Sequence, residues 1–217
     1  MFKKLSHWPL ILVFALGLAA CAVESQTALT PQKTVASKQV YNGPKVKVAL
    51  GAFENRTNYM RGVFSNGGDM LGTQARTIVK THLQESRRFS VLDRRNINSL
   101  AREADLAGTN QRLAGASYIV TGDVVEFGKK NVGDQQLFGI LGKGKAQVAY
   151  AKVNLLLVNT TTSEIVYTAQ GAGEVALSNR EVLGFGGTAG YDSTLNGKVL
   201  NLAIREAVDD LVRNLVL

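Results

Sequence analysis

The sequence is poor in the residues that most often carry chemistry: it has one cysteine, two histidines and three prolines among 217 residues. A single cysteine, Cys21, excludes an internal disulfide. Beyond residue 20 the one histidine is His82, so the sequence has neither a histidine cluster for a metal nor an H-E-x-x-H motif. His82 lies in a predicted helix and is interpreted as a satisfied surface or core side chain. Ser117 lies in a strand-like segment and not in a G-x-S-x-G elbow. We therefore expect no enzyme, no metal site and no cofactor.

The N-terminus has the organisation of a secretory signal, with two lysines followed by the apolar run Leu10–Leu18. The sequence L-A-A-C ending at Cys21 resembles a bacterial lipobox, which implies that residues 1–20 are a signal peptide and that Cys21 is lipidated. The alternatives are a plain secretory peptide with an incidental cysteine and a membrane-spanning anchor. The apolar run is short for a span, which needs roughly 20 residues.

Removal of the signal peptide changes the charge and exposes a tether. Without the two signal-peptide lysines, 23 basic residues face 17 acidic ones, a net charge of +6. We expect anionic lipid headgroups or a solvated basic surface to account for this excess, and no nucleic acid partner. Residues 21–44 are rich in Ser, Thr, Gln and Ala and are predicted to be a flexible tether. Ala22 replaces the Asp that retains similar lipoproteins in the inner membrane, which implies an outer-membrane anchor with the domain facing the periplasm.

Residues 45–217 are predicted to form one α+β domain, a mixed sheet packed by two to three helices. The expected strands are 45–53, 89–93 and 117–127, the last with a bulge at a Gly-Asp pair, followed by two strands across the turn Asn159–Ser163. The expected helices begin at the caps Asp69 and Asp93, and a third covers 196–215. Their apolar stripes are Leu71, Ala75, Ile78, Val79 and Leu83; Ile97, Leu100, Ala101 and Ala104, ended by Gly108; and Leu200, Ala203, Ile204, Ala207, Val208, Leu211 and Leu215.

In their shared order these motifs resemble the CsgG/HfaB family, the curli production assembly/transport lipoproteins. LDRRNINSLAREADL (92–106) is similar to the family's second helix, and YIVTGDVVEF (118–127) to its V-x-G-x-I strand. VNLLLVNTTTSEIVYT (153–168) is similar to the family's V-N-L-x-V-V-N-x-x-T-G-E-I pair, with Ser163 in the place of its usual glycine. The resemblance spans residues 45–215.

The resemblance implies a ring oligomer in which each subunit adds two β-hairpins to one shared transmembrane β-barrel, without nucleotide hydrolysis. It places the pore constriction in the loop after the first strand, where FSNGG aligns with the family's A-S-N-F-S and Gly67 replaces its Phe. The constriction candidates are Tyr59, Met60, Phe64, Ser65 and Asn66. Tyr59, Met60 and Phe64 have a second interpretation as loop anchors that pack on the domain.

The two membrane hairpins are expected at about 128–152 and 169–195, with Val148, Tyr150, Val175, Leu177, Leu183 and Phe185 as membrane candidates. Membrane strands alternate apolar and polar residues over roughly 9–11 positions. The apolar face switches from Val148 and Tyr150 to Val153, a pattern typical of a strand that passes from a membrane into a soluble core. The second hairpin is shorter than the family's hairpins.

Two further motifs have competing interpretations. Gly139–Ala146 contains G-x-x-x-x-G-K, but Ala146 stands where a phosphate loop needs Ser or Thr, and a strand pattern follows instead of a helix. We therefore predict the turn of the first hairpin and no nucleotide site. The cluster Arg87, Arg88, Arg94 and Arg95 is either a solvated face or a contact to a neighbouring subunit's Asp209 or Asp210.

Taken together, the sequence predicts an outer-membrane lipoprotein that forms or supports an oligomeric secretion channel for curli-like fibre or adhesin subunits. Its expected partners are other copies in a ring, outer-membrane lipid through Cys21, exported subunits and periplasmic accessory proteins. The alternative is a lipid-anchored periplasmic accessory protein that has no pore and binds another envelope protein.

Overall fold

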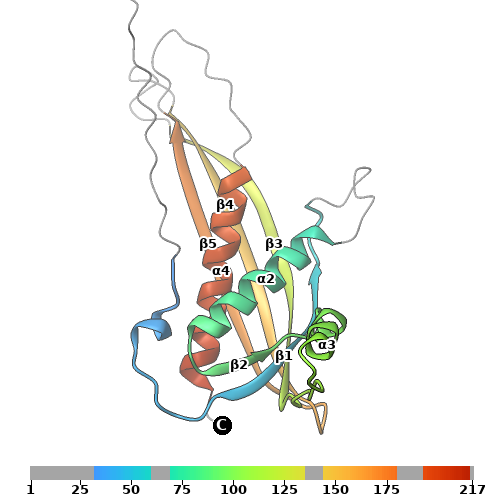
Figure 1. Ribbon diagram of the computed structural model, residues 1–217. Helices are drawn as coiled ribbons and strands as arrows, with labels where there is room; N and C mark the ends of the chain where they lie inside the picture. The colour runs from blue at the N-terminus through green and yellow to red at the C-terminus, as the bar shows by residue number, and fades with distance from the viewer. Residues whose placement is uncertain (1–31, 60–68, 135–143, 180–192, 216–217) are drawn as a thin grey trace, which may run out of the picture. The chain divides into compact units, whose positions relative to one another are not determined.

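A five-stranded mixed sheet in the order β2-β1-β3-β4-β5 is the centre of the fold in the computed structural model (Figure 1). The structure describes residues 32–59, 69–134, 144–179 and 193–215, all within the unit Gln32–Leu217. β1 (Val46–Asn55) pairs in parallel with β2 (Phe89–Leu92) and β3 (Tyr118–Asp134). β4 (Gly144–Asn159) pairs antiparallel with β3 and with β5 (Ile165–Asn179). This arrangement confirms the predicted α+β class.

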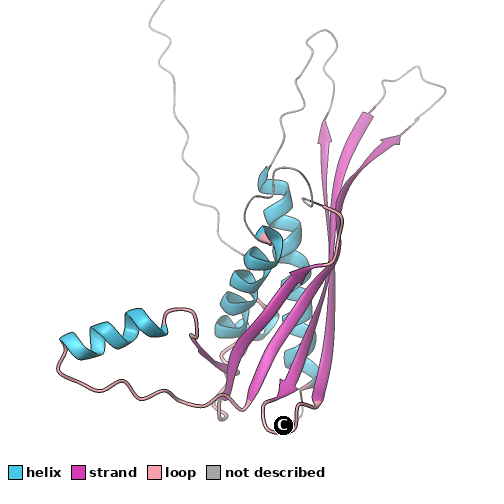
Figure 2. Ribbon diagram, turned by 90° about the vertical axis from the view of Figure 1, so that its right-hand side faces the viewer, coloured by secondary structure: helices cyan, strands magenta, loops and turns pink. Residues whose placement is uncertain are grey.

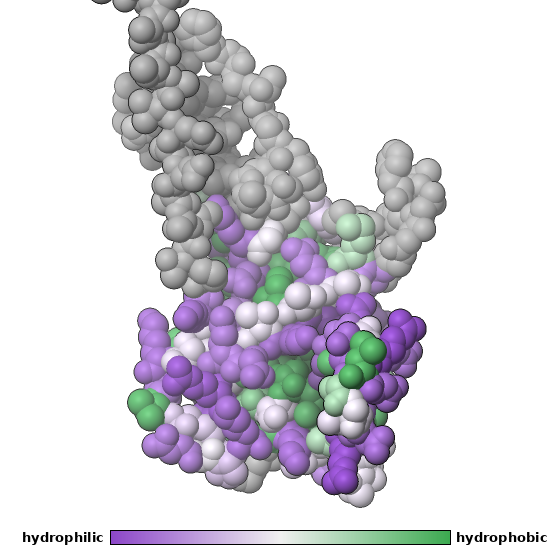
Figure 3. Space-filling view, in the orientation of Figure 1, coloured by the Kyte–Doolittle hydropathy of each residue, from purple (hydrophilic) through white to green (hydrophobic). Residues whose placement is uncertain are grey.

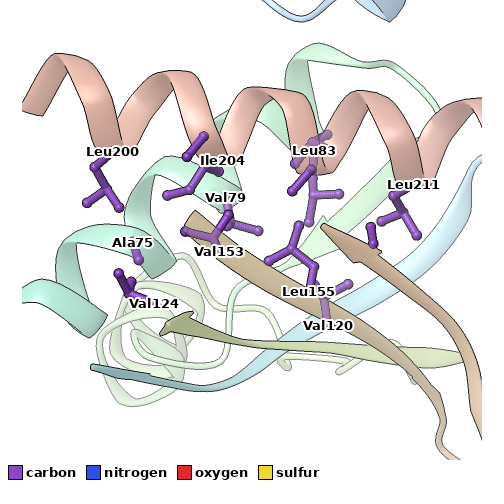
Figure 4. Packing of buried hydrophobic residues seen from close by; sticks show 14 of the residues in the cluster. Ala75, Val79, Leu83, Val120, Val124, Val153, Leu155, Leu200, Ile204 and Leu211 are labelled. Carbon is purple, nitrogen blue, oxygen red and sulfur yellow. The ribbon is translucent and has the colours of Figure 1, made fainter. Parts of the chain in front are cut away.

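Two helices, α2 (Met70–Glu85) and α4 (Ser193–Asn214), cover the same face of the sheet (Figure 2). Asp69 caps α2 as predicted, since its side chain accepts a hydrogen bond from Gly72 N at 2.7 Å. The predicted stripes of both helices face the core with β3 and β4 (Figure 4), and the side chains labelled there are Ala75, Val79, Leu83, Val120, Val124, Val153, Leu155, Leu200, Ile204 and Leu211. Leu215 packs against this core and is only partly buried.

The helix α3 (Ile97–Leu106) has no buried residue, although its predicted stripe indicated a core helix. It lies apart from the sheet (Figure 2), and hydrophobic residues are visible on its surface (Figure 3). Leu100 is 46% exposed. The N-cap is Asn96, so the prediction of Asp93 as the cap was wrong: Asp93 precedes the helix and accepts from the backbone N–H of Arg95 at 2.9 Å. Gly108, at φ 67°, follows α3 as predicted.

Part of the segment expected to be a tether is held on α4. The 3-10 helix η2 (Val35–Lys38) donates two backbone hydrogen bonds to the Asp209 carboxylate, from Val35 N at 3.0 Å and from Ala36 N at 3.3 Å. Asp209 is 2% exposed. Because that carboxylate is buried and accepts two backbone hydrogen bonds, Asp209 does not fit the alternative in which it pairs with an arginine of a neighbouring subunit.

The strand irregularities differ from the predicted bulge at Gly122-Asp123. Between the pairs Leu50↔Val120 and Phe53↔Gly122, β1 has one residue more than β3, so the first bulge is in β1. A second register shift lies between Val124 and Glu126 of β3. Gly122 is needed for close approach, because a Cβ there would lie 2.6 Å from the carbonyl oxygen of Asn154. The turn Asn159–Ser163 joins β4 to β5 as predicted.

Candidate functional site

The candidate site is the end of the sheet where β3, β4 and β5 continue beyond the helices (Figures 1 and 2). The pairing of β1 with β3 ends at Asn55↔Val124, whereas β3 and β4 stay paired to Asp134↔Gly144. β4 and β5 stay paired to Lys145↔Asn179. Over this part, which we call the projection (residues 126–134, 144–152 and 173–179), the described sheet has only three strands. Its base, with Ala149, Ala151 and Gly173, is still packed against the core and α4.

Strand register separates the predicted membrane residues into two groups. Val148 pairs with Ala176, and Ala149 pairs with Val175, so Val148 and Val175 belong to opposite faces. Val175 shares the face of the fully buried Ala149, which is the helix side, and Val148 and Tyr150 belong to the other side. Val148, Tyr150 and Val175 therefore do not form one lipid-facing surface, because successive residues of a strand point to opposite sides of the sheet.

The apolar face of β4 was predicted to switch between Tyr150 and Val153, but on the helix side the buried face continues past that point. The helix-side core extends without interruption from Leu157 to Ala149, since Ala149 and Ala151 are 0% and 3% exposed. Because Ala149 and Ala151 are small, the sequence pattern did not identify them as part of the buried face. Only residues beyond Val148 therefore extend past the buried core on this strand.

On the side away from the helices, the base of the projection has a charged band. Lys130 pairs with Glu174 at 2.9 Å, and its ammonium lies 5.9 Å from the centre of the Tyr150 ring. Lys152 and Glu126 are 3.7 Å apart. Because these side chains are about half exposed, each ion pair contributes little to stability, roughly 0–1 kcal/mol. These charged side chains indicate that the base of the projection faces water on the side away from the helices.

The loop after β1 is closed at its base by a small polar network. Asn55 Oδ1 accepts from Thr57 N at 2.9 Å and from Thr57 Oγ1 at 2.7 Å, and Asn55 Nδ2 donates to the carbonyl oxygen of Tyr59 at 2.9 Å. The backbone N–H of Asn55 donates to Asp69, the α2 cap. Both ends of the predicted constriction loop are thus tied to rigid elements.

Tyr59 packs against Phe127, with ring centres 4.8 Å apart and an interplanar angle of 59°. It is partly buried against the core, the geometry of a loop anchor. Next to it is a hollow of about 510 Å³, lined by Arg56, Thr57, Asn58, Tyr59, Val125, Glu126, Phe127 and Tyr150. The pKa of Arg56 is raised, first by its hydrogen bond to Asp123 and then by the charge of Glu54. The hollow joins the loop base to the projection.

Several predicted site residues lie outside the described residues: Cys21, Met60, Phe64, Ser65, Asn66, Leu183 and Phe185. Of Gly139–Ala146, the described part, Gly144–Ala146, is strand β4 and not the start of a helix. This agrees with the prediction that the segment is no phosphate loop. The side chain of Leu177 is also outside the described set, although its backbone belongs to β5.

His82 is a satisfied core histidine, as interpreted from the sequence. It is 2% exposed, with Nε2 2.9 Å from Asn201 Oδ1 and Nδ1 3.2 Å from Glu85 Oε2. Within the described ranges, no three His, Cys, Asp or Glu side chains are grouped so that they could hold a metal ion. None of the helices in the described part of the chain has the length and hydrophobicity to cross a membrane.

Sequence reasoning missed Asn55 and Thr57, and it treated four arginines as one cluster. Asn-x-Thr directly after a strand is a local turn signal that could have identified the loop base. The arginines form two pairs at opposite ends of β2: Arg88 lies 4.0 Å from the centre of the Tyr41 ring, and Arg94 donates to the carbonyl oxygen of Ala114. The strand predicted at 89–93 already lies between the two pairs.

Comparison with known proteins identifies the family. The family model for the curli production assembly/transport component CsgG matches residues 29–217. The chain belongs to the CsgG family. A Neisseria meningitidis serogroup B (strain ATCC BAA-335 / MC58) protein, whose name classes it provisionally as a lipoprotein, is 55% identical over 97% of this chain and 95% of its own length.

Solved structures are similar only at low identity. The PelC dodecamer from Paraburkholderia phytofirmans is 16% identical, with a TM-score of 0.37 over 78% of this chain and 94% of that one. A Helicobacter pylori homologue of the neuraminyllactose-binding hemagglutinin is 11% identical, with a TM-score of 0.40 over 83% of this chain and 93% of that one. The membership of this CsgG-family chain rests on the family model and the meningococcal relative.

Proposed function

We propose that this CsgG-family protein is an outer-membrane lipoprotein whose copies assemble into a ring and whose projections together form the wall of a secretion channel. The channel exports fibre or adhesin subunits by diffusion, without nucleotide hydrolysis. The description of the matched family names assembly and transport and no reaction. The observation that carries the proposal is the projection, the part of the described sheet in which only β3, β4 and β5 are paired.

The sequence of the projection supports this assignment. On β4, Ala146 and Val148 alternate with Lys145 and Gln147. An alternation of small or apolar residues with polar ones is the pattern of a strand between lipid and a wet lumen. Lys130 pairs in register with Val148, but its ammonium contacts Glu174, two residues before Ala176. The proposed lipid level therefore begins at the row of Val148 and Ala176, next to the charged band and on the same side of the sheet.

The end of the pairing between β1 and β3 supports the ring. This pairing ends at Asn55↔Val124, whereas β3 continues to Asp134. An open edge in lipid leaves backbone N–H and C=O groups unpaired, each at a cost of several kcal/mol, so such a sheet spans a membrane only when closed. When the sheets of neighbouring copies pair edge to edge in a ring, one kind of contact, repeated around the ring, pairs the backbone groups of every edge.

The anchor is the proposed acyl group on Cys21, followed by a tether up to the docked segment at Thr34. The lipoprotein name of the meningococcal relative supports this assignment. One acyl chain gives only marginal membrane binding, whereas several chains on one cysteine anchor a protein stably. The tether then lets the domain reach the periplasmic side of the ring.

A second candidate is an accessory lipoprotein without a pore, and the length of the projection favours it. Because Ala149 is already buried, residues 131–147 must supply both legs and the turn of the first hairpin. Two membrane legs alone need roughly 20 residues. The channel therefore requires that part of the sheet now beneath α4 enters the membrane.

The two candidates are separated by a matched pair of substitutions on β5. Ala176 and Gln170 are both exposed and belong to the same side of the strand, one in the projection and one beside the core. The lipidated protein is purified in mild detergent, and its oligomer mass and its conductance in planar bilayers are measured. The channel predicts a conducting ring for the parent and for Gln170→Arg, and loss of conductance with an unchanged fold for Ala176→Arg.

A parent protein that stays monomeric and never conducts would overturn the channel. A conducting ring that tolerates Ala176→Arg as well as Gln170→Arg would show that the assigned lipid side is wrong. Deletion of residues 181–187 tests the second hairpin: the channel predicts loss of membrane integration, with the folded domain retained.

A further inference from the structure

A basic hollow of about 410 Å³ lies between α2, the end of β2 and the start of α3, away from the projection. Leu50, Val91 and Leu92 give it apolar walls, and Arg76, Lys80, Arg94 and Arg95 give it positive charge. Figure 3 shows hydrophobic surface between α2 and α3, with hydrophilic residues around it. Asp93 is the one acidic residue among the described residues of the lining.

The carboxylate of Asp93 already accepts hydrogen bonds from neighbouring groups of the protein. Its carboxylate accepts from the backbone N–H of Arg95 at 2.9 Å, from Asn96 Nδ2 at 2.7 Å and from Lys80 Nζ at 3.3 Å. Lys80 therefore balances Asp93, and the Arg94 guanidinium donates to the neutral carbonyl oxygen of Ala114. With four basic residues and one acidic residue, the lining has a net charge of +3.

Arg76 shows the consequence of this imbalance. Its Nη2 donates to the carbonyl oxygen of Leu50 at 2.9 Å, but its Nε is buried and has no hydrogen-bond partner. A buried donor without an acceptor costs about 1–3 kcal/mol, and more when the group is charged. The pKa of Arg76 is lowered, first by burial and then by the charge of Arg95. An anion in the hollow would offset both effects.

The start of α3 adds a second source of positive potential. Asn96 is the N-cap, but its side chain makes no cap hydrogen bond because it donates to Asp93 instead. Backbone N–H groups of the first turn of a helix lack intrahelical partners and favour anions. Arg95 and Asn96, which lead into that turn, both line the hollow.

We propose that this hollow binds a phosphate group between Arg76 and Arg95, with Leu50, Val91 and Leu92 in contact with the apolar part of the molecule that carries it. Guanidinium groups match phosphate geometry with paired hydrogen bonds. A net charge of +3 suits a group that carries up to two negative charges better than a single carboxylate. The volume is within the range of small-molecule sites, roughly 300–1,000 Å³. The site needs neither a ring nor a pore.

Binding is tested on the full-length protein in an uncharged detergent by isothermal titration calorimetry. The probes are inorganic phosphate, dihexanoyl phosphatidylglycerol and a hexaglutamate peptide. We expect saturable binding of the phosphatidylglycerol, and weakening of roughly tenfold or more by Arg95→Gln, in line with the loss of a charged hydrogen bond. Arg95 is exposed, so this variant keeps the fold. Arg102→Gln, at an exposed arginine of α3 outside the hollow, is the matched control and leaves the affinity unchanged.

The probes separate the sources of the phosphate. Equal affinity for inorganic phosphate and the lipid would support the oxyanion site and assign it to a free phosphate, whereas tighter lipid binding would support the apolar contact. Absence of saturable binding of both would overturn the proposal. It would also be overturned if Arg102→Gln and Arg95→Gln weakened binding equally, or if the peptide bound more tightly than either phosphate probe.

Discussion

The Asp69 carboxylate accepts a hydrogen bond from the backbone N–H of Asn55, fourteen residues earlier in the chain. The same side chain caps α2 through Gly72 N at 2.7 Å. One carboxylate thus fixes the end of β1, the start of α2 and the spacing between the two ends of the loop that joins them.

Replacement of Asp69 by alanine is expected to destabilise the domain by about 1–2 kcal/mol, since the helix loses its cap and Asn55 its acceptor. The free energy of unfolding from urea titration measures the effect. Asp105→Ala, on the exposed helix α3, is the control and should change stability by less than about 0.5 kcal/mol. Equal effects for both variants would show that Asp69 has no special role.

Gly171 of β5 permits the closest approach between the sheet and α4. A Cβ at this position would lie 2.0 Å from the carbonyl oxygen of Ala203 and 2.4 Å from the backbone nitrogen of Ala207. Since backbone cannot give way as a flexible side chain can, Gly171→Ala should destabilise by about 3 kcal/mol or separate α4 from the sheet. Thermal unfolding measures the change, with Gly115→Ala, where nothing lies within 4 Å, as the control. A tolerated Gly171→Ala would contradict this helix position.

Ser163 is one of two residues other than glycine with positive φ among the described residues, at 61°. It stands where the family's strand pair usually has glycine, the residue that adopts this conformation without strain. Ser163→Gly should therefore stabilise the protein, by up to about 1 kcal/mol. Chemical denaturation measures the gain, and Ser99→Gly, inside α3, should destabilise instead. A loss of stability with Ser163→Gly would contradict the strain assigned to this turn.

Asp93 makes stability depend on pH. Hydrogen bonds from the Arg95 backbone and the Asn96 side chain lower the pKa of Asp93 to about 2, from an ordinary value of 3.8. Because the folded pKa is the lower one, the stabilisation is fully present above pH ~4 and is lost as pH falls from ~4 to ~2. Unfolding curves across this window should converge for the parent and Asp93→Asn at the acid end. A constant difference between the two proteins would contradict this assignment.

Local sequence patterns predicted the elements whose stability is itself local. The cap at Asp69, the turn Asn159–Ser163 and the stripe of α4 each depend on neighbours within a few positions along the chain. The amphipathic pattern of α3 was recognised by the same rule, but its burial was not. A pattern records that one face is apolar, and it contains no information on whether another element lies within reach.

Strand faces show the same limit. Val148 and Val175 both looked like membrane residues, but the pairing Ala149↔Val175 assigns them to opposite sides of the sheet. Asp209 looked like a surface acid, but its partners Val35 and Ala36 lie more than 170 residues earlier in the chain. Neither register nor so distant a contact can be inferred from a single sequence.

The sequence by itself determined the family, the α+β class, the position of most helices and strands and the absence of catalytic motifs, because these follow from residue type and short-range spacing. Only the tertiary structure decided that Val148 and Val175 belong to opposite sides of the sheet, how the base of the loop after β1 is closed and that Arg76 and Arg95 line one hollow. These features arise where segments distant in the chain pack together, so strand register and burial set their chemistry.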